Sequence, residues 1–145
     1  MRTLVVSTLL SLASLSAAWA QADVAASAAK EPGAVVTASG LVYRSLKDGT
    51  GASPAATETV KVHYRGTFPD GKEFDSSYAR GTPAEFPLNR VIKCWTEGVQ
   101  LMKVGGKSKL TCPAAIAYGE KGAGGVIPPN AQLQFEVELL GIAGK

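Results

Sequence analysis

Residues that support metal, nucleophilic or cofactor chemistry are scarce in this sequence. It contains a single histidine, His63, and two cysteines, and no cluster of carboxylates stands near the histidine. We therefore expect His63 to be a solvated or structural residue and the protein to bind no metal. The short motifs of serine hydrolases, zinc proteases, P-loop enzymes and dinucleotide-binding folds are missing as well. These absences argue against covalent and cofactor-dependent catalysis, and we expect no cofactor.

Neither positive nor negative charge is in large excess. Fifteen Lys and Arg against 12 Asp and Glu give a formal net charge of +3, and charged residues make up 19% of the chain. No basic stretch carries regularly interleaved aromatic residues, so we expect no nucleic-acid partner. A hydrophobic content of 46% in 145 residues fits one soluble folded domain with short appendages.

The apolar run at the N-terminus is short. Arg2 precedes an apolar stretch at residues 4–15, and residues 18–20 (AWA) have the small-x-small pattern that signal peptidase requires. A run of about a dozen residues falls short of the ~20 that a membrane-spanning helix needs. We predict that residues 1–20 are a cleaved signal peptide and that the protein is periplasmic or secreted, with no stable membrane association after cleavage. An uncleaved membrane anchor is the alternative.

Alanine dominates the segment that follows. Residues 21–38 contain a Pro-Gly pair and no apolar pattern strong enough to build a core. We expect them to form a flexible leader, with a short fraying helix as the alternative. Residues 39–145 are expected to form the folded domain.

Two segments show the period-2 alternation of half-buried strands. Val60, Val62 and Tyr64 alternate with polar side chains, and four apolar residues alternate with polar ones between residues 132 and 141. Further extended segments are expected at residues 41–44, 73–76 and 107–112, where turn-forming residues flank them.

One short amphipathic helix is also predicted. Ile92, Trp95, Val99 and Met102 recur at spacings of three and four, and the glycine pair at residues 105–106 is expected to end the helix. The fold class that follows is α+β, with a curved antiparallel β-sheet wrapped around one short α-helix.

Six short motifs occur in a fixed order between residues 40 and 142. Their order and spacing resemble the FKBP-type peptidyl-prolyl cis–trans isomerase family. The motifs are residues 62–66 (VHYRG), 73–77 (EFDSS), 91–98 (VIKCWTEG), 117–119 (AYG), 126–129 (VIPP) and 135–140 (FEVELL).

The resemblance implies an enzyme, a peptidyl-prolyl cis–trans isomerase, with a proline-binding pocket whose floor is Trp95. It implies that Asp75 and Tyr118 are the catalytic polar residues and that Arg80 pairs with the aspartate. The same aromatic and branched residues are also what a small β-rich core requires, and a pocket floor can serve as both. The residues implied to bind substrate are Tyr64, Phe74, Arg80, Val91, Ile92, Trp95, Ile127 and Phe135.

The sequence departs from the family at two positions of this implied pocket. Ala84 stands where many members carry an aromatic wall residue, and Cys94 stands where glycine usually precedes the tryptophan. The first departure is expected to open one side of the pocket. It should weaken the binding of macrolide inhibitors such as rapamycin without abolishing catalysis.

The function implied by the resemblance is faster folding of exported proteins, through binding of the twisted Xaa-Pro amide in an apolar pocket. The expected partners are Xaa-Pro segments of unfolded or exported proteins. Two alternatives stay open at this point. One is a chaperone that holds proline-containing segments, and the other is a module that engages host molecules, each with incidental catalysis.

The two cysteines are predicted to form a disulfide. Their number is even, the predicted signal peptide leads to an oxidising compartment, and in an FKBP-like fold the strand of Cys112 passes beneath the helix that Cys94 precedes. Two free buried thiols are the alternative.

Overall fold

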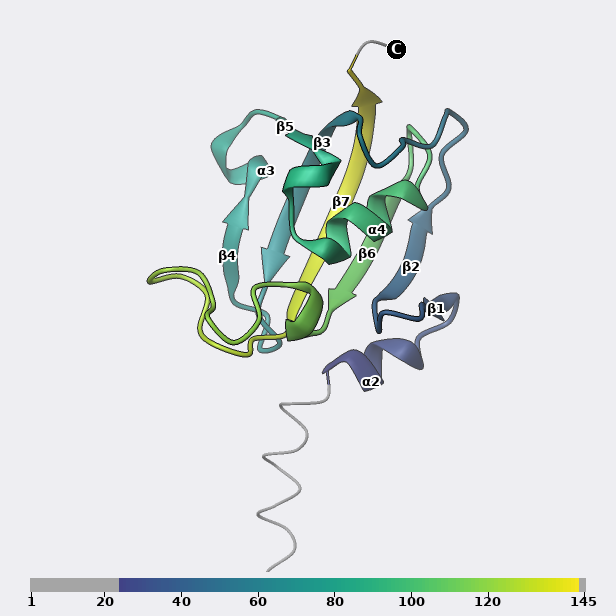
Figure 1. Ribbon diagram of the computed structural model, residues 1–145. Helices are drawn as coiled ribbons and strands as arrows, with labels where there is room; N and C mark the ends of the chain where they lie inside the picture. The colour runs from purple at the N-terminus through teal and green to yellow at the C-terminus, as the bar shows by residue number, and fades with distance from the viewer. Residues whose placement is uncertain (1–23, 144–145) are drawn as a thin grey trace, which may run out of the picture.

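The computed structural model describes residues 24–143, in which an antiparallel β-sheet curves over a short helix, α4 (Lys93–Gln100) (Figure 1). The predicted signal peptide at residues 1–20 lies outside the described residues. The strand order in the described part is β1-β2-β6-β7-β3-β4, and β5 also pairs with β3. The strands are β1 (Ala34–Val36), β2 (Val42–Lys47), β3 (Thr59–Thr67), β4 (Glu73–Ser76), β5 (Ala84–Pro87), β6 (Lys107–Cys112) and β7 (Leu133–Ile142).

The central strands β3 and β7 follow the predicted alternation. Val60, Val62 and Tyr64 of β3 are buried, as are the four apolar residues that alternate along β7. Trp95 and Val99 of α4 belong to the same buried cluster. The apolar faces of the two strands therefore form the concave surface on which α4 packs.

Helix α4 is shorter than the sequence predicts, since it ends at Gln100 and not at the glycine pair. The Gly105 N–H bonds to the Leu139 carbonyl oxygen at 2.9 Å, and the Leu139 N–H bonds to the Gly106 carbonyl oxygen at 3.0 Å. The two glycines thus attach the chain to β7 just before β6 begins. Directly after Gln100, the Leu101 and Met102 N–H groups bond to carbonyl oxygens three residues back, so the helix has ended before the glycine pair.

A disulfide between Cys94 and Cys112 connects α4 to β6, with the two Cα atoms 5.9 Å apart. Both side chains are fully buried. The predicted pairing is therefore the one that the structure contains. It fixes the first turn of α4 to the sheet directly beside Trp95.

The segment before β2 is part of the fold, which differs from the expected flexible leader at residues 21–38. It forms a helix, α2 (Val24–Ala29), and the edge strand β1, which pairs with β2. Figure 1 shows α2 beneath the lower end of the sheet. Ala28 is buried, and the Glu31 carboxylate forms ion pairs with Lys109 at 3.2 Å and Arg44 at 3.8 Å.

An apolar spot on the outer face of the sheet accounts for this packing. Val42 and Thr111 lie opposite each other on β2 and β6, and both are buried although their strand neighbours Leu110 and Cys112 face α4. Because α2 contacts both strands, it covers surface that would otherwise face water. Among residues 24–143, no helix is both long and apolar enough to cross a membrane.

Candidate active site

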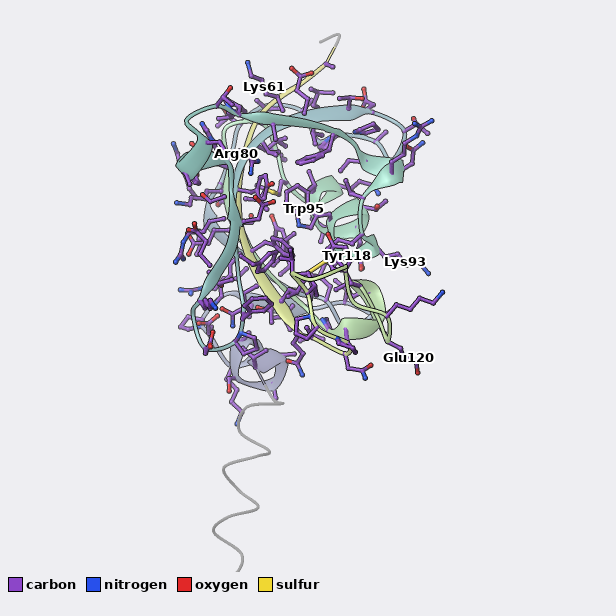
Figure 2. The ribbon with its side chains drawn as sticks, turned by 90° about the vertical axis from the view of Figure 1, so that its left-hand side faces the viewer. Lys61, Arg80, Lys93, Trp95, Tyr118 and Glu120 are labelled. Carbon is purple, nitrogen blue, oxygen red and sulfur yellow. A yellow bond between two sulfur atoms is a disulfide. The ribbon has the colours of Figure 1, made fainter. Side chains whose placement is uncertain are left out.

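A cavity of about 420 Å³ opens on the concave side of the sheet. Trp95 of α4 lies in the middle of the molecule in Figure 2, between the loop that carries Tyr118 and the sheet edge where Arg80 is seen. The residues that line the cavity are mostly aromatic or branched, with one carboxylate and one guanidinium. They are Tyr64, Phe74, Asp75, Phe86, Arg90, Val91, Ile92, Trp95, Tyr118 and Phe135.

Three aromatic rings hold the Trp95 indole in place. Its ring centroid lies 5.2 Å from Tyr64, 5.5 Å from Phe86 and 5.5 Å from Phe135, and each contact is edge-to-face. Such contacts fix ring orientation as well as burying apolar area. Trp95 is only 4% exposed, so the indole is a rigid floor that also belongs to the core.

A glycine on β3 allows the aromatic wall to close. Phe74 and Phe135 meet edge-to-face with centroids 5.7 Å apart. A Cβ atom on Gly66 would lie 2.6 Å from Phe74 Cζ and 2.9 Å from Phe135 Cε1. Phe74 and Phe135 can therefore pack in this way only because Gly66 has no side chain.

The carboxylate of Asp75 is held by two side chains at the edge of the cavity. The Tyr64 hydroxyl donates to Oδ2 at 2.5 Å, and Arg80 Nη1 donates to Oδ1 at 2.6 Å. Arg80 Nη2 also donates to the Tyr64 hydroxyl at 3.0 Å. The three side chains form a closed triangle of hydrogen bonds with fixed geometry.

A four-residue helix, α3 (Ser77–Arg80), aims Arg80 at the aspartate. The Ser76 side chain caps it by accepting from the Ala79 N–H at 3.2 Å, and Gly81 ends it in the left-handed conformation at φ 79°. Helix α3 was not predicted from the sequence, although serine and glycine at its two ends are ordinary capping signals. One turn is too short to show helical periodicity.

His63 supports this helix from the outer face of the sheet. Its Nδ1 is 2.8 Å from the Ser77 hydroxyl, and its ring stacks on Tyr78 with centroids 4.5 Å apart. The Ser77 hydroxyl also accepts from the Tyr64 N–H at 2.7 Å. Residues 24–143 contain no group of three His, Cys, Asp or Glu side chains that is arranged to hold a metal ion.

The electrostatics of the site favour a charged Asp75 and protonated phenols. Burial disfavours the carboxylate, but hydrogen bonds from Tyr64 and Arg80 outweigh it, so the pKa of Asp75 lies below its usual value. Burial, followed by the charge of Asp75, raises the pKa of Tyr118. Burial and the hydrogen bond to Asp75 also raise the pKa of Tyr64.

Eight of the ten residues predicted for the site line the cavity. Arg80 is not among the lining residues and reaches the site through Asp75 and Tyr64. Ile127 is 6% exposed and lines a separate hollow with Pro128 and Pro129. The tight loop before it, where a Cβ on Gly122 would lie 2.2 Å from the Ile127 carbonyl oxygen, holds it there.

Two lining residues, Phe86 and Arg90, were missed by the sequence analysis. Phe86 stands two positions after Ala84 on β5, and residues two apart on a strand face the same side of the sheet. Because the sequence places Ala84 at the pocket wall, this spacing could have predicted that Phe86 lines the cavity too. Arg90 ends a single 3₁₀ turn, Leu88–Arg90, which carries no pattern that marks a site.

Comparison with known proteins agrees with this geometry. Residues 51–140 match the family described as FKBP-type peptidyl-prolyl cis-trans isomerase. A protein of that description from Aeromonas hydrophila, FkpA, is 61% identical over 114 residues, which are 79% of this chain and 42% of the relative. This chain therefore spans less than half the length of that relative.

Two solved structures are similar in fold. The crystal structure of FkpA from Escherichia coli has a TM-score of 0.82 at 44% identity, covering 90% of this chain and 61% of that one. A peptidyl-prolyl cis-trans isomerase from Pseudomonas syringae has a TM-score of 0.79 at 37% identity, covering 94% of this chain and 98% of that one. They confirm the predicted fold class.

Proposed function

The chain belongs to the FKBP-type peptidyl-prolyl cis–trans isomerase family, and from this premise we propose that it accelerates the rotation of Xaa-Pro peptide bonds in exported polypeptides. One observation carries the proposal. An aromatic cavity with the Trp95 indole as its floor has at its edge a carboxylate, Asp75, whose position two hydrogen-bond donors fix.

The reaction requires no covalent chemistry. Rotation about the amide bond passes over a barrier of about 18–20 kcal/mol because twisting destroys the resonance of the C–N bond. An enzyme lowers this barrier if it binds the twisted amide better than either planar form. A twisted amide has a less polar carbonyl and loses less on leaving water, so an apolar cavity of the right size favours it.

The cavity walls are proposed to hold the proline and its neighbour. In this proposal the proline ring packs on Trp95, and the residue before it packs against Phe74. The size of the cavity, about 420 Å³, supports this arrangement, since ligand pockets begin at ~300 Å³. The lining residues proposed to bind substrate are Tyr64, Phe74, Val91, Ile92, Trp95 and Phe135. Arg80 is proposed to act on substrate through Asp75 and Tyr64, and Ile127 from the separate hollow that it lines.

Two polar groups are proposed to hold the substrate carbonyls. Neither the Tyr118 hydroxyl nor the Ile92 backbone N–H is hydrogen-bonded to another residue within 24–143. The pKa of Tyr118 is raised, so the hydroxyl stays a donor at neutral pH. Both groups are thus available to a peptide in the cavity.

Asp75 is proposed to act by its charge. Its lowered pKa keeps it ionised at neutral pH, and its hydrogen bonds leave no need for it to exchange a proton during the reaction. The negative charge stands beside the cavity and is fixed before substrate arrives, which is the condition for electrostatic stabilisation without reorganisation. Asp75 and Tyr118 are therefore the proposed catalytic residues.

Export is proposed on two grounds. Residues 1–20 have the composition of a signal peptide, and a buried disulfide joins Cys94 to Cys112. Disulfides persist in oxidising compartments such as the periplasm. The substrates would then be Xaa-Pro segments of proteins that fold outside the cytoplasm.

A protease-coupled assay tests the function directly. A short peptide with an apolar residue before proline is expected to isomerise faster with the protein than without it. A rate equal to the spontaneous one, measured with protein whose folding has been verified by circular dichroism, would leave only a binding role for the cavity.

A further inference from the structure

Arg90 differs from the other arginines in the described part of the chain. Arg44, Arg65 and Arg80 each form an ion pair, with Glu31, Glu73 and Asp75 respectively. Arg90 is exposed, lines the cavity, and forms no hydrogen bond or ion pair with any residue within 24–143. Its guanidinium keeps its donors free for a ligand.

The other charges near the cavity do not neutralise Arg90. Asp75, the one acidic lining residue, is already paired with Arg80. Glu120, two residues after Tyr118, is exposed and does not line the cavity. Lys93, at the start of α4, is exposed and extends away from the molecule on the side of Tyr118 (Figure 2). Among the residues that line the cavity, Arg90 thus carries the one charge without an ion-pair partner.

Arg90 is also within reach of a bound peptide. It lies two residues before Ile92, whose backbone N–H is the proposed anchor for a substrate carbonyl. An extended arginine side chain spans ~7 Å, about the length of two extended peptide residues. Arg90, Ile92 and Trp95 line the same cavity, so with a proline ring on Trp95 the guanidinium lies along the wall that a bound peptide would follow.

We propose that Arg90 selects Xaa-Pro segments that carry an acidic residue next to the proline. This inference rests on the proposed isomerase function and specifies its substrate class. A carboxylate matches the planar guanidinium in charge and in hydrogen-bond geometry. Because the pair is exposed, its effect is modest and salt-dependent.

Peptides that carry either Glu or Gln provide the test, because these side chains have nearly the same shape and differ in charge. Matched peptides carry Glu or Gln directly before or directly after the proline, and magnetisation-exchange NMR measures kcat/KM without a coupling protease. We expect kcat/KM for Glu to exceed that for Gln by about two- to fivefold at low ionic strength in at least one of the two positions. The ratio should shrink towards one at high salt.

Variants assign the preference to Arg90. Arg90→Gln is expected to bring the Glu-to-Gln ratio to about one, and Arg90→Glu to favour a Lys peptide instead. Lys61→Gln removes the same charge from the outer face of β3 and should keep the wild-type ratio. Circular dichroism verifies that each variant is folded.

Two failures are distinguishable. If the wild type does not accelerate even the Gln peptides, the isomerase proposal itself fails. If it accelerates Glu and Gln peptides equally at both positions, or if Arg90→Gln keeps the Glu preference, the isomerase proposal stands and the role of Arg90 is overturned.

Discussion

The hydroxyl of Tyr64 donates a hydrogen bond to the Asp75 carboxylate at 2.5 Å, while the ring of the same tyrosine lies edge-on to Trp95 with centroids 5.2 Å apart. Tyr64 is 5% exposed. One side chain thus connects the packed core to the polar edge of the candidate site. Its ring and its hydroxyl can be tested separately.

Tyr64→Phe should lower both activity and stability. The ring contacts remain, but Asp75 loses one of its donors. We expect kcat/KM to fall by about tenfold, the rate equivalent of ~1.4 kcal/mol, and the free energy of unfolding to fall by about 1–2 kcal/mol. Tyr43→Phe is the matched control. The Tyr43 hydroxyl accepts a hydrogen bond of 2.9 Å from the Ser108 hydroxyl, and Tyr43 does not line the cavity. Equal activity losses in the two variants would contradict a special role for Tyr64.

Asp75→Ala and Tyr118→Phe should reduce isomerase activity while lowering stability much less than Trp95→Ala does, since both side chains are partly exposed. Trp95→Ala should reduce both, because truncating a large buried aromatic destabilises by about 3–5 kcal/mol. Peptide kinetics and urea unfolding measure the two effects. If Asp75→Ala proved as destabilising as Trp95→Ala and its folded fraction stayed fully active, Asp75 would be structural.

Gly66→Ala should distort the aromatic wall. The added methyl group meets Phe74 and Phe135, and Phe135 is only 5% exposed, so the rings must move. We expect a loss of about 1–3 kcal/mol in unfolding free energy and a raised KM. Gly141→Ala adds the same methyl group on β7, where a Cβ meets nothing within 4 Å. Indistinguishable KM values for the two variants would show that the wall tolerates the change.

Purified mature protein should carry the Cys94–Cys112 disulfide. Alkylation under denaturing conditions without reductant should add no label, and two labels should follow reduction. The bond links residues 18 apart, so its reduction should lower the unfolding free energy by about 3 kcal/mol on the chain-entropy model. Two labels before reduction would exclude the bond.

Activity should not depend on pH between about pH 5 and pH 9. The lowered pKa of Asp75 and the raised pKa of Tyr118 keep both groups in one protonation state over that range. Below it, protonation of Asp75 should reduce the rate. The stabilising effect of the Asp75 hydrogen bonds is likewise present above its usual pKa of about 3.9 and is lost as the pH falls through the lower folded value. Exchange NMR measures the profile, and a bell-shaped curve centred near neutrality would indicate a titrating acid or base.

The sequence alone was enough to predict the fold class, the family and most of the cavity. The alternation along β3 and β7 is strong because each strand has one face on the core and one on solvent. The motifs that line the cavity lie on β3, β4, α4, β7 and the loop between β6 and β7, so their order along the chain carries information about their arrangement. Periodicity predicted the existence of α4 for the same reason, but not its end at Gln100, which precedes the glycine pair that bonds to β7.

Tertiary structure alone decided the features that depend on contacts between distant segments. The docking of α2 requires Val42 and Thr111 to form a buried spot on the outer face of the sheet. The separation of Ile127 from the cavity depends on a tight loop. The entry of Arg90 into the cavity depends on a single 3₁₀ turn before α4. A helix or strand can be predicted from local sequence because its apolar residues recur at a regular spacing, and each recurrence strengthens the prediction. A single contact between distant residues produces no regular spacing, so it can be found only in the tertiary structure.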